Sequence, residues 1–375
     1  MDISFKFDPE ILIGADTLSM AGPVCRRFGK RIMVVSDRAL DPRIMDRLKE
    51  ILEDSGIDTI VFNRIEEEST IETAGNIVEL SQAAHCDALI GVGSQKTQII
   101  SRMAAITAPS KISAFELLDG RIHDKFLPLI AIPVEGLDAF SLTEYFIAVD
   151  PRNRLIKSVQ SPSNLYAAVI IDSSLFGFLS GSTAFNYVFD GFFSAAEAYC
   201  SAKANFLSDI LLEKALNFYA KMLKNGGSGI NADNFAQASF LTALGSSASS
   251  PGIGAALPYA ISARFPVQKQ LCSAVLFPHI IEKLVNARPE KIARVAAFLG
   301  IAGKGASVAE TANSAAESIR RSMASLGIKP DLKEFSIQLD RLTAAVETAR
   351  SMEFVANSPW TVSQEDVFEI MKKII

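Results

Sequence analysis

The chain has 375 residues, of which 49% are hydrophobic and 21% charged, so it contains enough apolar material for more than one packed core. Its 37 basic and 42 acidic residues give a formal net charge of −5 without any basic block, which argues against nucleic acid as a partner. Four cysteines lie far apart and form no CxxC pair, which is typical of a reduced, cytoplasmic protein without a disulfide framework or a zinc ribbon.

The first half of the chain alternates short apolar runs with amphipathic stretches. The apolar runs predict strands at residues 31–36, 59–62, 87–90, 127–133 and 167–172. Helical spacing predicts helices between them, near residues 44–52 and 71–84. This alternation favours a mostly parallel sheet with helices on both faces, and such sheets bind ligands at the carboxyl ends of their strands.

The strand signal stops after about residue 180. Apolar residues at helical spacing then predict helices at 188–200, 208–223, 231–244, 269–285, 289–298, 308–326 and 338–349. The sequence therefore predicts two domains, an α/β nucleotide-binding-like domain over residues 1–180 and an all-α domain over residues 181–375.

The mean hydropathy of the chain, +0.24, makes a membrane-spanning helix worth testing. The candidate segment is residues 234–263, because this is the longest stretch without a charged residue. Gly245, Pro251, Gly252 and Pro258 interrupt it, whereas a spanning helix needs about 20 predominantly apolar residues. We expect buried helices around an internal loop and no contact with membranes. The acidic N-terminus also lacks the apolar segment of a signal peptide.

Three segments of the chain carry a family resemblance. Residues 90–94, IGVGS, resemble a GGGS diphosphate loop between a strand and a helix, and residues 190–209 are similar to a DAxxHxxEAY…S…AN…SD signature. Residues 252–279 lie where a G…HAxAH…HGxxNAxLLPH stretch would be. Together these segments resemble the iron-containing (group III) alcohol dehydrogenases. The resemblance implies the dehydroquinate synthase-like fold of that family, with a dinucleotide-binding α/β domain followed by an all-α domain.

The metal site of that family is where the chain departs most from the pattern. The family holds a divalent metal with one Asp and three His, and only the Asp is kept, as Asp190. The His positions carry Ser194, Ala255 and Lys269, and a further active-site His position carries Tyr259. Since one carboxylate cannot fill the coordination shell of iron or zinc, we expect no metal here.

Asp190 lies on an apolar segment beside Phe189 and Phe192, so its carboxylate needs a partner. Lys269 is the natural candidate, because both positions face the metal in the family. Such an ion pair would replace the charge of the metal, or it would be a structural salt bridge that fills the cavity. Tyr259 is the candidate proton donor, with a packed tyrosine as the alternative.

The prediction of a cofactor site depends on four residues. By resemblance, Gly91, Gly93 and Ser94 would bind the diphosphate of NAD or NADP at a helix N-terminus, and Asp37 would bind the adenosine ribose. Alternatively, the glycines only make a tight turn, and Asp37 caps the helix that follows it.

A second cofactor segment has lost its hydroxyl groups. Val134, Glu135 and Asp138 replace residues of a TTAGTGSE turn, and carboxylates beside a diphosphate would repel it unless they point away. Glu197, in contrast, is interpreted as a packing or hydrogen-bonding acid.

The resemblance implies an NAD(P)-dependent oxidoreductase that acts on an alcohol or aldehyde as a homodimer. Without the metal, Lys269 would stabilise the alkoxide and Tyr259 or a water would relay the proton. The alternative is a catalytically inactive relative that serves as a binding or regulatory protein. A third possibility, the chemistry of dehydroquinate synthases or glycerol-phosphate dehydrogenases, is weaker because those relatives also need a metal held by His.

Overall fold

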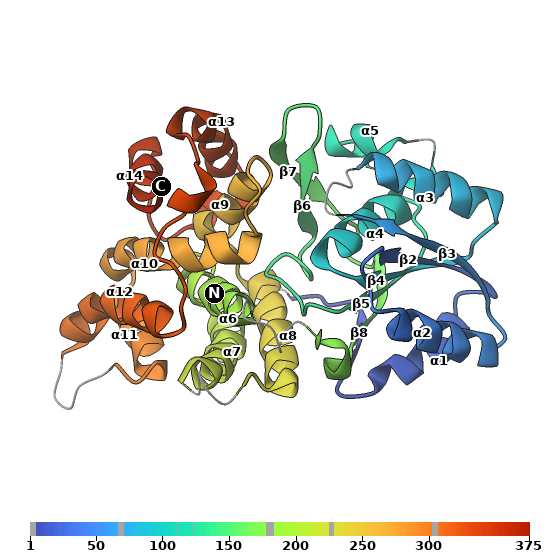
Figure 1. The fold of residues 1–375 in the computed structure, drawn as a ribbon, viewed down its shortest axis with the longest axis horizontal. Coiled ribbons are helices and arrows are strands. Elements are labelled where there is room, and N and C mark those ends of the chain that lie inside the picture. Colours follow the sequence, from blue (N-terminus) through green and yellow to red (C-terminus); the bar gives the residue numbers. More distant parts are fainter. Residues whose placement is uncertain are drawn as a thin grey trace. The chain divides into compact units, whose positions relative to one another are not determined.

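The computed structural model describes residues 5–66, 71–110, 112–122, 124–177, 184–224, 229–301 and 307–375 (Figure 1). The chain forms two compact units. Unit 1 comprises Met1–Leu137, Thr143–Arg152 and Ser158–Gly177, and unit 2 comprises Asp138–Leu142, Asn153–Lys157 and Phe178–Ile375. The expected domain boundary at residues 180 and 181 lies outside the described residues. Two short segments that precede it belong to unit 2.

Unit 1 is built on a parallel sheet of six strands in the order β1-β8-β5-β4-β2-β3. The strands are β1 (Glu10–Ile13), β2 (Arg31–Asp37), β3 (Asp58–Ile65), β4 (Ala88–Gly93), β5 (Leu129–Pro133) and β8 (Tyr166–Ile171). Every residue of β4 and β5 is buried, which explains their continuous apolar runs. The five predicted strands are confirmed, whereas β1 was not predicted because it is short and half-exposed.

Helices cover both faces of this sheet, as predicted (Figure 1). They are α1 (Ala21–Cys25), α2 (Pro42–Asp54), α3 (Glu72–Ala83), α4 (Gln95–Thr107) and α5 (Ala114–Leu118). Leu48 and Leu52 of α2 join Ile32, Val34 and Ile90 of the sheet in one hydrophobic core. Strands β6 (Tyr145–Asp150) and β7 (Leu155–Gln160) form a separate two-stranded sheet that the sequence patterns did not predict.

Apart from its two short segments before residue 178, one of which holds the start of β7, the described part of unit 2 is helical. Its helices are α6 (Ala184–Cys200), α7 (Phe206–Lys224), α8 (Ala232–Ala248), α9 (Ile253–Ser262), α10 (Lys269–Ala287), α11 (Pro289–Phe298), α12 (Val308–Ser325), α13 (Leu339–Arg350) and α14 (Gln364–Ile374). The seven predicted helices are confirmed. Helices α9 and α14 lay outside the seven predicted ranges, although α9 falls in the stretch where buried helices around a loop were expected. Ser363 and Asp366 form a capping box at the start of α14.

Helices α8 and α9 confirm the interpretation of the uncharged stretch as buried helices around a loop. Among the described residues, no helix has the length and apolar character needed to cross a membrane. All four cysteines are free and buried, in agreement with the absence of a predicted disulfide framework.

Candidate functional site

The strand–turn–helix predicted around the glycines is present in unit 1. Strand β4 ends at Gly93, and Ser94 is the N-cap of α4. Gly93 has φ +148°, and a Cβ there would lie 2.0 Å from Asp37 Oδ2. A Cβ on Gly91 would lie 2.8 Å from Ser101 Oγ. A side chain at either position would collide with Asp37 or Ser101, so the glycines let the turn pack closely against side chains of unit 1.

Asp37, at the end of β2, lies against this turn. Its Oδ2 accepts a hydrogen bond from Ser94 N at 2.6 Å, and its Oδ1 accepts one from Ser94 Oγ, also at 2.6 Å. The structure therefore brings Asp37, Gly93 and Ser94 together. The alternative role of Asp37 as the cap of the following helix is wrong, because Asp41 is the N-cap of α2 and accepts from Arg43 N at 2.9 Å.

Val134, Glu135 and Asp138, the three residues after β5 that depart from the family turn, have different surroundings. Val134 packs against the core of unit 1. Glu135 points to α4, where its Oε2 accepts a hydrogen bond from Gln95 N at 3.2 Å. Asp138 belongs to unit 2 and contacts Lys269. Of the two carboxylates suspected beside a diphosphate, only Glu135 lies at the N-terminus of α4.

In unit 2, the predicted ion pair between Asp190 on α6 and Lys269 at the start of α10 is present. Lys269 Nζ lies 2.9 Å from Asp190 Oδ2 and 3.8 Å from Asp138 Oδ2. The three side chains are only 11–12% exposed, so solvent screens their charges weakly. The role of Asp138 was missed, because no sequence pattern indicates that its short segment joins unit 2.

Tyr259 on α9 completes this group of charged side chains. Its hydroxyl donates a hydrogen bond to Asp138 Oδ2, and Lys269 Nζ lies 5.2 Å from the centroid of its ring. Asp190 Oδ1, in contrast, is buried and accepts no hydrogen bond from any residue that the structure describes. A buried carboxylate oxygen without a donor is costly, so this atom is suited to a donor from outside the chain.

A divalent metal does not fit these residues. Ala255 offers no ligand atom, Ser194 offers only a hydroxyl, and the ammonium of Lys269 is bound to Asp190, the one carboxylate at the four family ligand positions. Within the described ranges there is no group of three or more His, Cys, Asp or Glu that could hold a metal ion. A dication at this position would also be repelled by the ammonium.

Glu197 on α6 is a hydrogen-bonding acid, as interpreted from the sequence. Its carboxylate is 2% exposed and accepts bonds from the backbone of Gly254 at 2.6 Å, Ala255 at 2.8 Å and Gly252 at 3.2 Å. Burial raises the pKa of Glu197 to about 7, and the three N–H groups counteract part of this rise. Glu197 thereby anchors the first turn of α9, the helix that carries Tyr259, a role that the sequence did not reveal.

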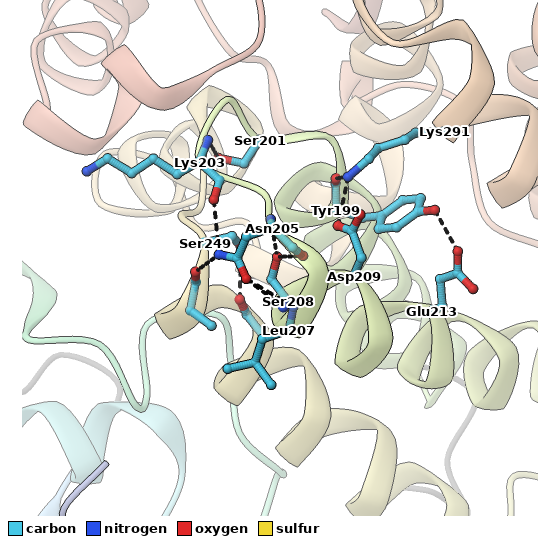
Figure 2. A network of polar contacts seen from close by, with 12 residues as sticks. Tyr199, Ser201, Lys203, Asn205, Leu207, Ser208, Asp209, Glu213, Ser249 and Lys291 are labelled. Carbon is cyan, nitrogen blue, oxygen red and sulfur yellow. Dashed lines mark hydrogen bonds and ion pairs between the residues drawn. The ribbon is translucent and has the colours of Figure 1, made fainter. Parts of the chain in front are cut away.

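The remaining residues of the second signature form a structural network (Figure 2). Asn205 Oδ1 accepts from Leu207 N at 3.1 Å and Ser208 N at 3.2 Å, while its Nδ2 donates to the carbonyl of Ala248 at 2.7 Å. Asn205 thus both caps α7 and joins it to the end of α8.

Lys291 completes the network from α11. Its Nζ donates to Asp209 Oδ1 at 2.7 Å and to the carbonyl of Tyr199 at 2.6 Å, and the Tyr199 hydroxyl donates to Glu213 Oε1 at 2.7 Å (Figure 2). This part of the signature therefore specifies how the helices pack.

Comparison with solved structures shows the same fold. A crystal structure of 1,3-propanediol oxidoreductase superposes with a TM-score of 0.91 over 100% of both chains at 20% sequence identity. The sulfoacetaldehyde reductase of Bifidobacterium kashiwanohense, solved in complex with NAD+, gives a TM-score of 0.83 at 14% identity and covers 100% of this chain and 99% of its own. The predicted fold class is confirmed.

Sequence comparison agrees with the fold. The 1,3-propanediol dehydrogenase of Citrobacter freundii is 24% identical over 370 residues, which are 96% of this chain and 95% of that protein. The lactaldehyde reductase of Escherichia coli K12 is 20% identical over 94% of both chains. These matches define the class, an oxidoreductase of the alcohol dehydrogenase type, as predicted.

Two family models cover most of the chain. The model for iron-containing alcohol dehydrogenase matches residues 8–173, and the model for the C-terminal part of the Fe-containing alcohol dehydrogenase family matches residues 187–375. The chain belongs to the iron-containing alcohol dehydrogenase family.

Proposed function

We propose that this chain interconverts an alcohol and its carbonyl compound with NAD or NADP and without a resident divalent metal. The observation that carries the proposal is the Lys269 ammonium, 2.9 Å from the only retained ligand-type carboxylate, Asp190. The strand–turn–helix at Gly91, Gly93 and Ser94, at the N-terminus of α4, supports a dinucleotide as the cofactor. The nicotinamide, when bound, would accept or supply the hydride.

Lys269 supplies the positive charge in this proposal. Oxidation of an alcohol develops negative charge on its oxygen, and a preorganised ammonium in a site of low dielectric constant stabilises that charge strongly. Asp190 and Asp138 hold the ammonium in place.

Asp190 Oδ1 is the proposed acceptor for the substrate hydroxyl. It is buried and has no donor within the described part of the chain, and an alcohol O–H would supply one. Tyr259, hydrogen-bonded to Asp138, is the proposed proton relay.

A non-catalytic relative remains the second candidate, and one observation favours it. The carboxylates of Asp37 and Glu135 accept the hydrogen bonds of the Ser94 and Gln95 amides, which a cofactor diphosphate would need. In that case the scaffold would serve as a binding or regulatory protein.

The test is to analyse the purified protein for metals and to assay it with NADH and NADPH against a panel of small aldehydes, before and after treatment with a chelator. We expect turnover with less than stoichiometric metal and no loss after chelation. Stoichiometric iron or zinc, with activity that the chelator removes, would contradict the proposal. If no turnover is detected with either NADH or NADPH, the non-catalytic relative would be favoured. Light scattering would test the expected homodimer, and cell fractionation the expected cytoplasmic location.

A further inference from the structure

We infer that Glu135 is a built-in competitor of the cofactor diphosphate, so that the cofactor binds only when this carboxylate leaves the N-terminus of α4. The inference rests on the proposed function. It identifies a residue that sets cofactor affinity, and it concerns a position where this chain departs from the family's hydroxyl-bearing turn.

The pairing of strands β4 and β5 positions Glu135 near the N-terminus of α4. Strands β4 and β5 are paired in parallel with Gly93 opposite Pro133, and Val134 N donates to the carbonyl of Gly93 at 3.1 Å. The chain therefore leaves β5 directly beside the glycine turn. From there the Glu135 side chain reaches Gln95 N at 3.2 Å.

The Glu135 carboxylate occupies a backbone N–H group that the cofactor diphosphate would need, and both groups are negatively charged. Gln95 is the first residue of α4, and an anion is stabilised at a helix N-terminus by the unpaired N–H groups and the helix dipole. A carboxylate and a phosphate satisfy the same groups, so they compete for them, and their charges repel each other at short range.

Asp37 is not the residue expected to move. Its two oxygens bind the amide and the hydroxyl of Ser94 at 2.6 Å each, whereas the bond from Gln95 N to Glu135 Oε2 is longer, at 3.2 Å. Glu135 also has the longer and more flexible side chain.

Two buried hydroxyl groups beside the glycine turn are a second, independent observation in support of the inference. The hydroxyls of Thr97 and Ser101 are fully buried and have no hydrogen-bond partner among the residues that the structure describes. Thr97 Oγ1 lies 3.1 Å from the Cβ position of Gly93, and Ser101 Oγ lies 2.8 Å from that of Gly91. Unsatisfied groups beside both glycines indicate a place that accepts polar atoms from a ligand.

The experiment is a titration of the full chain with NADH, followed by cofactor fluorescence, for the wild type, Glu135→Gln, Glu135→Ala and the control Glu144→Gln. Glu144 is an exposed residue of unit 1, so its variant makes the same change of charge away from the turn. Inorganic pyrophosphate, as a competitor of NADH, reports on the diphosphate position separately.

We expect both Glu135 variants to bind NADH about tenfold more tightly than the wild type, and pyrophosphate to compete more strongly, with Glu144→Gln unchanged. Binding by Glu135→Gln alone, without binding by the wild type, would support the inference in its strongest form. Equal affinity of the wild type and both Glu135 variants would overturn the inference and leave the proposed function intact. No binding by any folded variant would overturn both.

Discussion

Lys269 Nζ lies 2.9 Å from Asp190 Oδ2, and neither side chain is more than 11% exposed. By the family resemblance of the sequence, we expect this ammonium to stand where the family has a metal-binding histidine. A positive charge thereby lies beside Asp190, and among the described residues no group of three or more His, Cys, Asp or Glu could hold a dication.

The first prediction concerns Lys269→Met. Removal of the ammonium leaves the buried Asp190 carboxylate without its ion-pair partner, so we expect the free energy of unfolding to fall by on the order of 3 kcal/mol. We also expect turnover to fall by about 100-fold, because the stabilising charge at the substrate oxygen is lost. Urea denaturation and steady-state kinetics measure the two effects.

A double variant separates the catalytic role from the structural one. Lys269→Met combined with Asp190→Asn removes both charges, so most of the lost stability should return. Turnover should stay low in the double variant, because it lacks both the ammonium and the carboxylate that we propose to accept the substrate hydroxyl. Restored turnover, or unchanged turnover in Lys269→Ala, would instead identify a salt bridge that only fills the cavity.

The second prediction concerns Tyr259→Phe. If the hydroxyl relays a proton through Asp138, we expect kcat to fall by about 100-fold and its pH profile to lose one limb. Tyr219→Phe is the matched control, because it removes another buried tyrosine hydroxyl, from α7. A loss of less than about twofold, equal to that of the control, would identify Tyr259 as a packed aromatic residue.

The fold could be predicted from the sequence because buried strands and helices place their apolar residues at regular spacings along the chain. Strands β4 and β5 are apolar at nearly every position, and α10 and α11 show helical spacing, so these elements were found within a few residues. Strand β1 was missed because four half-exposed residues at a sheet edge carry little pattern.

The candidate site could be predicted only in part. The Asp190–Lys269 pair followed from a buried carboxylate that needed a partner and from the family positions of both residues. The contacts of Asp138 with Tyr259 and of Glu135 with Gln95 depend on how the chain turns after β5. Such turns are set by tertiary packing, and their side-chain directions have no sequence period.

The third prediction concerns the network in Figure 2. Asn205→Ala removes the cap of α7 and the bond to the Ala248 carbonyl, so we expect a loss of about 1–2 kcal/mol in the free energy of unfolding. Asn205→Asp keeps the acceptor of the cap and should recover part of that loss. KM for cofactor and substrate should stay within about twofold, since this network packs helices; a tenfold change in KM would assign it a direct role in binding.

The fourth prediction concerns pH and Glu197. Its folded pKa of about 7 lies above the ordinary value of 4.5, so between these values the folded state holds a proton that the unfolded state releases. The proton-linked stability is therefore fully present below pH 4.5 and is lost as the pH rises to about 7. The difference amounts to about 3 kcal/mol.

Glu197→Gln isolates this effect, because a glutamine cannot titrate. Gly254 N bonds Oε1 of Glu197, whereas Ala255 N and Gly252 N bond Oε2. A glutamine amide keeps an acceptor oxygen on one of these sides only and directs an NH₂ group at the backbone donors on the other, so the variant should be less stable at pH 5. Its disadvantage relative to the wild type should shrink steadily from pH 5 to pH 8, as measured by urea denaturation at each pH. Parallel pH curves for the two proteins would show that the three backbone N–H groups, which favour the carboxylate, outweigh its burial and keep Glu197 charged throughout this range.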